Sequence, residues 1–141
     1  MINPKSFYDH LSSHSDFITG VPDSLLKEFN ACVLNEHPKN KHIIAPNEGT
    51  SIGLAIGNYI STGKVPTVYM QNSGIGNAVN PLMSLADKDV YGVPMLVIIG
   101  WRGEPGVKDE PQHFKQGLIQ EDLLKAMHLD YSILQLKLDD N

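Results

Sequence analysis

The chain has 141 residues, a net charge of -5 at pH 7 with histidine neutral, 41% hydrophobic residues and 19% charged residues. These values suit a single globular domain with a core of ordinary size. The negative balance and the lack of a Lys/Arg cluster argue against nucleic acid as a partner, because phosphate binding needs a basic face. No apolar run is long enough to span a membrane and the amino terminus lacks a signal region, so we expect a cytoplasmic protein.

Cysteine and histidine indicate neither a disulfide nor a metal site. Cys32 is the single cysteine, which favours a reducing compartment, and we expect it to be a small core residue. His10 and His14 stand one helical turn apart, but no further ligand accompanies them. The sequence therefore predicts no metal held by this chain.

Apolar runs alternate with helical patterns along the chain. Strands are expected at residues 16–19, 41–45, 65–70, 94–99 and 131–134. Helices are expected at residues 4–11, 25–34, 48–60, 78–86 and 121–128. A polar loop is expected at 71–77, a long loop at 100–117 and a polar tail at 138–141. The alternation predicts one α/β domain over 1–141, a three-layer sandwich whose mostly parallel sheet carries helices on both faces.

The segment 45–57 joins the second expected strand to a helix. Glycines recur at Gly49, Gly53 and Gly57, on one side of that helix. Each costs about 1 kcal/mol relative to alanine, so the stripe indicates close packing or a ligand. Glu48 opens the helix and allows two interpretations: an acid that stabilises the first turn, or a carboxylate that faces a ligand nitrogen.

Three polar segments follow strand ends and are therefore expected at one edge of the sheet, where such folds bind ligands. They are Glu48, residues 71–77 and residues 101–113. Residues 73–77 match part of a phosphate-binding turn, although a tight turn with positive φ angles explains the glycines better. In the loop 101–113, Arg102 and Lys108 suit a doubly charged anion, but a solvated loop with internal ion pairs is an equal alternative.

Several motifs, taken in order, resemble the pyrimidine-binding domain of thiamine-diphosphate-dependent enzymes. They are Gly-Val-Pro-Asp at 20–23, Asn-Glu-Gly-Thr at 47–50, Thr-Gly-Lys at 62–64, Gln-Asn-Ser-Gly-Ile-Gly-Asn at 71–77 and Ile-Gly at 99–100. The loop 100–113 is most similar to the phosphonopyruvate decarboxylases. The sulfopyruvate decarboxylase alpha subunits share the region 70–77 but diverge in that loop.

The resemblance implies a decarboxylase that converts phosphonopyruvate to phosphonoacetaldehyde and CO2 with thiamine diphosphate. It implies that Glu48 hydrogen-bonds N1′ of the aminopyrimidine and favours its imino tautomer, and that Asp23 assists proton transfer. The cofactor-binding residues would be Glu48, Gln71, Asn72, Ser73 and Gly74. We further hypothesise that the substrate phosphonate meets Arg102, Lys108 and His113.

One part that the family needs has no counterpart among these residues. The diphosphate and its Mg2+ are held in such enzymes by a Gly-Asp-Gly motif, which does not occur here. We therefore expect a diphosphate-binding partner subunit or domain in an oligomer, a pyrimidine-binding domain without its last strand, and an inactive isolated chain. A split subunit, a fragment of a longer enzyme and a non-catalytic relative are all open, as are a sulfopyruvate decarboxylase alpha subunit and a nucleotide-binding module.

Overall fold

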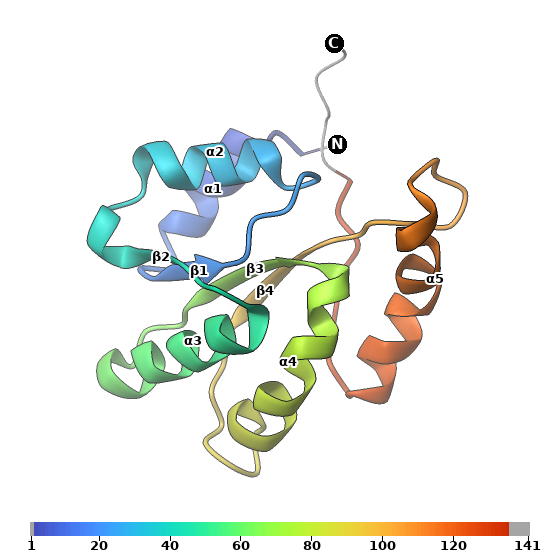
Figure 1. Cartoon of the computed structure of the whole chain (residues 1–141). Helices are drawn as coiled ribbons and strands as arrows, with labels where there is room; N and C mark the ends of the chain where they lie inside the picture. The colour runs from blue at the N-terminus through green and yellow to red at the C-terminus, as the bar shows by residue number, and fades with distance from the viewer. Residues whose placement is uncertain (1, 136–141) are drawn as a thin grey trace.

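A parallel four-stranded sheet forms the centre of the protein, as a computed structural model that describes residues 2–135 shows (Figure 1). The strand order is β2-β1-β3-β4, and every neighbouring pair is parallel. The strands are β1 (Ile18–Gly20), β2 (His42–Ile44), β3 (Thr67–Gln71) and β4 (Leu96–Gly100). The predicted α/β class with a parallel sheet is confirmed.

Helices cover both faces of this sheet, as predicted (Figure 1). One face carries α1 (Pro4–Ser12) and α2 (Lys27–Glu36). The other carries α3 (Glu48–Thr62), α4 (Ile75–Pro81) and α5 (Pro111–Ala126). Short helical turns complete the chain at η1 (Lys39–Lys41), η2 (Asn72–Gly74) and η3 (Leu82–Ala86).

The alternation of side chains along β3 divides the core in two. Val68 and Met70 pack with α3, α4 and α5, whereas Tyr69 between them packs with α1 and α2. All three are 0–1% exposed. Since successive strand residues point to opposite faces, a continuous apolar run is what a doubly covered strand requires. Because every pair is parallel, the carboxyl ends of the strands lie at one edge of the sheet, where the polar segments begin.

Helix α5 begins earlier than the sequence pattern predicts. Pro111 occupies its first turn, where proline has no hydrogen bond to lose, and the helix then runs through the expected loop to Ala126. The prediction of a loop over 100–117 was therefore wrong beyond residue 110. Position 117, inside α5, requires glycine because a Cβ there would stand 1.8 Å from the carbonyl oxygen of Gly103.

Other boundaries also differ. Residues 131–134 form no strand, so the predicted last strand is wrong, and the predicted helix at 78–86 is preceded by helical turns from residue 72. Cys32 is half-buried beside the α1–α2 core instead of fully buried. The predicted polar tail at 138–141 lies outside the described residues.

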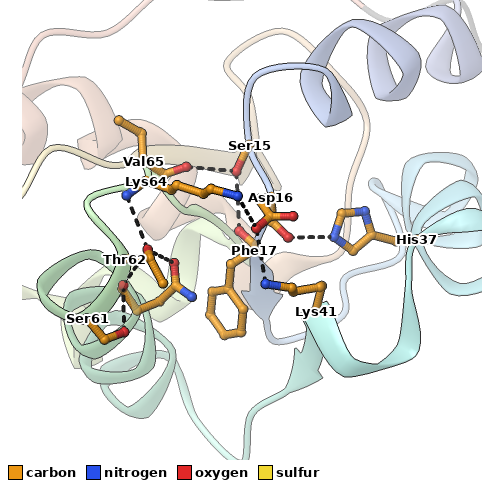
Figure 2. A network of polar contacts seen from close by, with 10 residues as sticks. Ser15, Asp16, Phe17, His37, Lys41, Ser61, Thr62, Lys64 and Val65 are labelled. Carbon is orange, nitrogen blue, oxygen red and sulfur yellow. Dashed lines mark hydrogen bonds and ion pairs between the residues drawn. The ribbon is translucent and has the colours of Figure 1, made fainter.

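The amino ends of three strands are joined by a polar network (Figure 2). Asp16, before β1, accepts from Lys41 at 3.1 Å and from Lys64 at 2.9 Å, and its carbonyl contacts His37 Nε2 at 3.3 Å. Ser15 Oγ donates to the carbonyl of Val65 at 3.1 Å. This network lies at the opposite ends of the strands from the candidate site and leaves the carboxyl edge to other residues.

Candidate functional site

Glu48 begins α3, the helix that follows β2, and is half-buried. Asn47 caps the helix by accepting from the backbone N–H of Thr50 at 2.9 Å. The capping role is therefore filled by Asn47, and the Glu48 carboxylate turns instead toward the segment after β3. Its Oε2 accepts a hydrogen bond of 2.8 Å from Nδ2 of Asn77 on α4.

Gly74 provides the space that the Glu48 side chain occupies. A Cβ at Gly74 would lie 2.3 Å from Glu48 Cγ and 2.5 Å from its Oε1. The φ angle of Gly74 is -71°, so the prediction that positive φ angles explain the glycines at 74 and 76 was wrong. What requires glycine at 74 is the close approach of the carboxylate, which supports the interpretation of Glu48 as a site residue.

The polar residues that end β3 are ordered by their own contacts. Gln71 Nε2 donates to Ser73 Oγ at 2.7 Å. Asn72 is 2% exposed and donates through Nδ2 to the carbonyl of Arg102 at 2.7 Å. Its Oδ1 is buried without a hydrogen-bond partner among the described residues, an arrangement that normally indicates a missing water or ligand.

Asp23 is a buried carboxylate at the turn between β1 and α2, 7% exposed. Its Oδ2 accepts from the backbone N–H of Leu25 at 3.1 Å and lies 2.3 Å from where a Cβ on Gly100 would stand. Burial raises the pKa of the Asp23 carboxyl above its ordinary value, against the opposing effects of backbone N–H groups and of the charges on Arg102 and His113. A carboxyl in this state is suited to carry a proton.

Arg102 forms an internal ion pair in the loop after β4. Its Nε donates to Asp109 Oδ2 at 2.8 Å and its Nη2 donates to Oδ1, a two-pronged arrangement. Its Nη1 donates to Ser24 Oγ at 2.7 Å. The side chains of Arg102 and Asp109 are 18% and 11% exposed, so the alternative of an internal ion pair is confirmed for this part of the loop.

The other two predicted substrate residues differ from Arg102. Lys108 is exposed and takes part in none of the hydrogen bonds or ion pairs found between residues 2 and 135. His113 lies in the first turn of α5, half-buried and close enough to Asp23 to influence its charge. The structure thus brings Arg102 and His113 to Asp23, and gives Lys108 no such contact.

Sequence reasoning did not single out Asn77, Asp109 and Ser24 as site residues. Asn77 and Asp109 lie within segments it marked as polar, but spacing alone does not pair them with Glu48 and Arg102. Within residues 2–135 no three His, Cys, Asp or Glu side chains gather in a way that could hold a metal ion. No helix in the same range has the length and apolar character of a membrane span.

Comparison with known proteins identifies the family. Residues 5–127 match the family described as thiamine pyrophosphate enzyme, N-terminal TPP binding domain. The chain belongs to this family. The matched segment contains Asp23, Glu48, Asn72, Arg102 and His113.

Two relatives of this thiamine pyrophosphate enzyme domain carry specific names. The chain is 37% identical over 117 residues to a phosphonopyruvate decarboxylase of Streptomyces viridochromogenes, a match that covers 83% of this chain and 28% of that protein. It is 36% identical over 121 residues to sulfopyruvate decarboxylase subunit alpha of Methanococcus maripaludis, covering 86% of this chain and 70% of that subunit. The chain thus spans little more than a quarter of the first relative.

A solved structure supports the fold. An enzyme from Mycobacterium smegmatis described as thiamin diphosphate-dependent superposes with a TM-score of 0.57 over 72% of this chain and 19% of its own, at 22% identity.

The residues at the carboxyl edge fit the pyrimidine end of the family's cofactor. Oε2 of Glu48 accepts a hydrogen bond from Asn77, and its Oε1 lies against Gly74 in the space that a Cβ would occupy in any other residue. A carboxylate in this position is an acceptor for a protonated ring nitrogen. The Oδ1 of the buried Asn72, just after β3, is a polar atom to which none of the described residues donates a hydrogen bond.

Proposed function

We propose that this chain is the pyrimidine-binding part of a thiamine-diphosphate-dependent 2-keto acid decarboxylase of the cytoplasm. The proposed substrate is phosphonopyruvate, and the products are phosphonoacetaldehyde and CO2. The observation that carries the proposal is the Glu48 carboxylate, held by Asn77 above Gly74 at the carboxyl edge of the sheet. The names of the relatives support the reaction class.

In this proposal thiamine diphosphate supplies the electron sink that lets the keto acid lose CO2. Glu48 would hydrogen-bond the pyrimidine N1′ and share its proton, and Gln71, Asn72, Ser73 and Gly74 would line the ring. Glu48 acts best where water is excluded, because a poorly solvated carboxylate holds a shared proton more readily.

Asp23 supplies the proton that the reaction consumes. When phosphonopyruvate loses CO2, the carbon that carried the carboxylate must gain one proton to become the aldehyde carbon. Burial of Asp23 favours its protonated form, which is the state a proton donor needs. Solvent restores that proton after each turnover.

The substrate anion is assigned to the loop between β4 and α5. Arg102 has N–H groups beyond the three that bind Asp109 and Ser24, and these point to a phosphonate oxygen as a further acceptor. Lys108 and His113 complete the proposed contact. Because Asp109 offsets the charge of Arg102, the exposed Lys108 supplies much of the net attraction for the dianion.

A diphosphate-binding partner, with Mg2+, completes the proposed oligomeric enzyme. Gly53 and Gly57 line an open groove on α3 together with Phe17, Leu54 and Asn58. Among the described residues, no atom lies within 4 Å of a Cβ built on either glycine. We assign this groove to the partner, since a helix face without side-chain bulk allows another backbone to come close.

A second candidate is a sulfopyruvate decarboxylase alpha subunit. The favouring observation is the identity of 36% over 121 residues to the M. maripaludis subunit. A nucleotide-binding module is a weaker alternative, and it predicts dinucleotide binding without magnesium or a partner.

The deciding experiment is a gentle pull-down of the tagged chain from its native host, with mass spectrometry of what elutes. A second chain with a Gly-Asp-Gly motif supports a split decarboxylase, and a longer single chain makes these residues part of a larger enzyme. The eluate is then supplied with thiamine diphosphate, Mg2+ and either phosphonopyruvate or sulfopyruvate. Faster turnover of one keto acid identifies the substrate, and elution of the 141-residue chain alone without turnover rejects the proposal.

A further inference from the structure

Arg102 joins three separate segments at the carboxyl edge of the sheet. Its backbone carbonyl accepts from Asn72 after β3, its Nη1 donates to Ser24 after β1, and its remaining contacts reach Asp109 before α5. Ser24, Asn72 and Asp109 lie far apart in the sequence, with helices and strands between them. Arg102 therefore fixes the segments after β1, after β3 and before α5 relative to one another.

Asp109 holds the guanidinium in this position. It accepts from Arg102 Nε and Nη2, from the backbone N–H of Gly103 at 2.7 Å and from that of Glu110 at 2.8 Å. These donors occupy both carboxylate oxygens, so Asp109 has little freedom to rotate. The Arg102 partner lowers the pKa of Asp109, with desolvation opposing it, so the pair stays charged at neutral pH.

The far end of the guanidinium reaches the turn that carries Asp23. Ser24 is exposed, whereas Asp23 beside it is buried against Gly100. The Asp23 turn is also held by Asn30, whose Nδ2 lies 3.4 Å from the Asp23 carbonyl. Backbone hydrogen bonds also hold the turn, from Leu26 N–H to the Asp23 carbonyl at 3.2 Å and from Lys27 N–H to the Ser24 carbonyl at 3.3 Å. The contact of 2.7 Å from Arg102 to Ser24 is shorter than each of these.

We infer that the Arg102–Asp109 ion pair is a positioning device that fixes the Asp23–Ser24 turn against the end of β4 and sets the charge around the Asp23 carboxylate. Asp109 is a positioning residue that acts through Arg102. The inference deepens the proposed function, on which it rests only for the chemical use of Asp23.

The test of position uses amide hydrogen exchange in the full chain. The Leu25 N–H, which donates to Asp23 Oδ2, reports whether the turn is closed. Asp109→Asn replaces one of the carboxylate oxygens that accept from Arg102 and from the backbone N–H groups. We expect exchange at Leu25 to become about tenfold faster or more. Asp16→Asn is the matched control, since it makes the same chemical change in the network at the opposite strand ends (Figure 2).

Ser24→Ala covers the case in which Asp109→Asn disturbs the whole fold. This change removes one hydrogen bond and leaves the ion pair in place, and we expect exchange at Leu25 to be about three- to tenfold faster. Exchange at Gly103, whose N–H binds Asp109, should stay slow. If Leu25 keeps its wild-type exchange rate in Ser24→Ala, the positioning device does not exist.

The test of charge uses the NMR titration of the Asp23 carboxyl carbon. The charged groups that face Asp23 are Arg102 and His113. Arg102→Gln removes one of them and leaves Asp109 unpaired, so the pKa of Asp23 should rise, whereas Arg102→Lys should restore part of the difference. An unchanged titration in Arg102→Gln would overturn this part of the inference.

Turnover of the assembled enzyme separates the inference from the proposed function. If Asp23 donates the proton, Asp109→Asn lowers kcat for pyruvate, which lacks the anion assigned to Arg102, with little change in the KM for pyruvate. If Asp23→Asn turns over normally while Asp109→Asn still speeds Leu25 exchange, the catalytic role of Asp23 is wrong and the positioning device stands.

Discussion

The side-chain amide of Asn77 donates a hydrogen bond of 2.8 Å to Oε2 of Glu48, which joins the start of α3 to α4. The bond fixes Oε2 and thereby also restricts where Oε1 of the same carboxylate can lie. Because Glu48 is only half-buried, packing alone does not hold its side chain. The Asn77 amide therefore fixes the orientation of the Glu48 side chain.

Asn77→Ala should weaken the binding of thiamine diphosphate to the assembled protein by about tenfold or less, the value of one such hydrogen bond. Isothermal titration calorimetry measures the affinity. Asn80→Ala is the control, since Asn80 lies one turn further along α4 and binds Ser84 instead of Glu48. Equal losses in both variants would show that the Asn77–Glu48 contact has no part in binding.

Gly74→Ala should be destabilising, because its Cβ would lie 2.3 Å from Glu48 Cγ. We expect a loss of about 1–3 kcal/mol in the free energy of unfolding, or a displaced Glu48 with lost activity, as for other overpacked sites. Gly76→Ala is the matched control, since a Cβ there meets no described atom within 4 Å. Urea denaturation and activity of both variants make the comparison, and similar midpoints together with similar activities would contradict the assigned crowding.

Arg102→Ala should raise the KM for phosphonopyruvate more than the KM for pyruvate, which lacks the second anion. Steady-state kinetics of the assembled enzyme with both keto acids provide the measurement. Lys115→Ala removes an exposed cation of α5 outside the proposed site and should change neither constant. An equal rise in the KM for both substrates would contradict the assignment of Arg102 to the phosphonate.

The location of the site was predictable because its polar motifs follow the apolar runs that form parallel strands. The motifs at 20–23, 47–50 and 71–77 each follow an apolar run, and parallel strands bring such ends together. Helix α3 was also predicted from residue 48, with a glycine expected at its end. Gly63 does end it, in the left-handed region.

The contacts within the site were not predictable from local pattern. Gly103 and Gly117 are fourteen positions apart, and only their close approach explains why a glycine stands inside α5. The pairing of Arg102 with Asp109 likewise depends on the turn that the loop makes, marked by positive φ angles at Gly103 and Gly106. Charge in a loop predicts ion pairs in general but does not say which residues form them.

Asp23→Asn should stabilise the protein at pH 7. Burial raises the pKa of Asp23 above its unfolded value of about 3.9, so the ionised carboxylate costs stability above the folded pKa. That cost is absent below the unfolded pKa, where both states are protonated. The gain in the variant should therefore be present at neutral pH and vanish below about pH 3.5.

Thermal unfolding of Asp23→Asn across this pH range checks the sign. Asp16→Asn should behave in the opposite way, because Lys64 and Lys41 lower the pKa of Asp16 and its charge favours the fold at neutral pH. A loss of stability at pH 7 in Asp23→Asn would show that the hydrogen bonds to the carboxylate outweigh its burial.

Gly53→Ala and Gly57→Ala should change folding and assembly in opposite directions. Both glycines lie inside α3 with open space beside them, so alanine should stabilise the isolated chain by about 0.4–1 kcal/mol at each position. If the groove receives a diphosphate-binding partner, the same methyl groups should weaken that association, because they occupy the space where the two backbones approach. Denaturation measures the first effect and analytical ultracentrifugation of the mixed chains the second. Stabilised variants that still assemble with wild-type affinity would place the partner on another face.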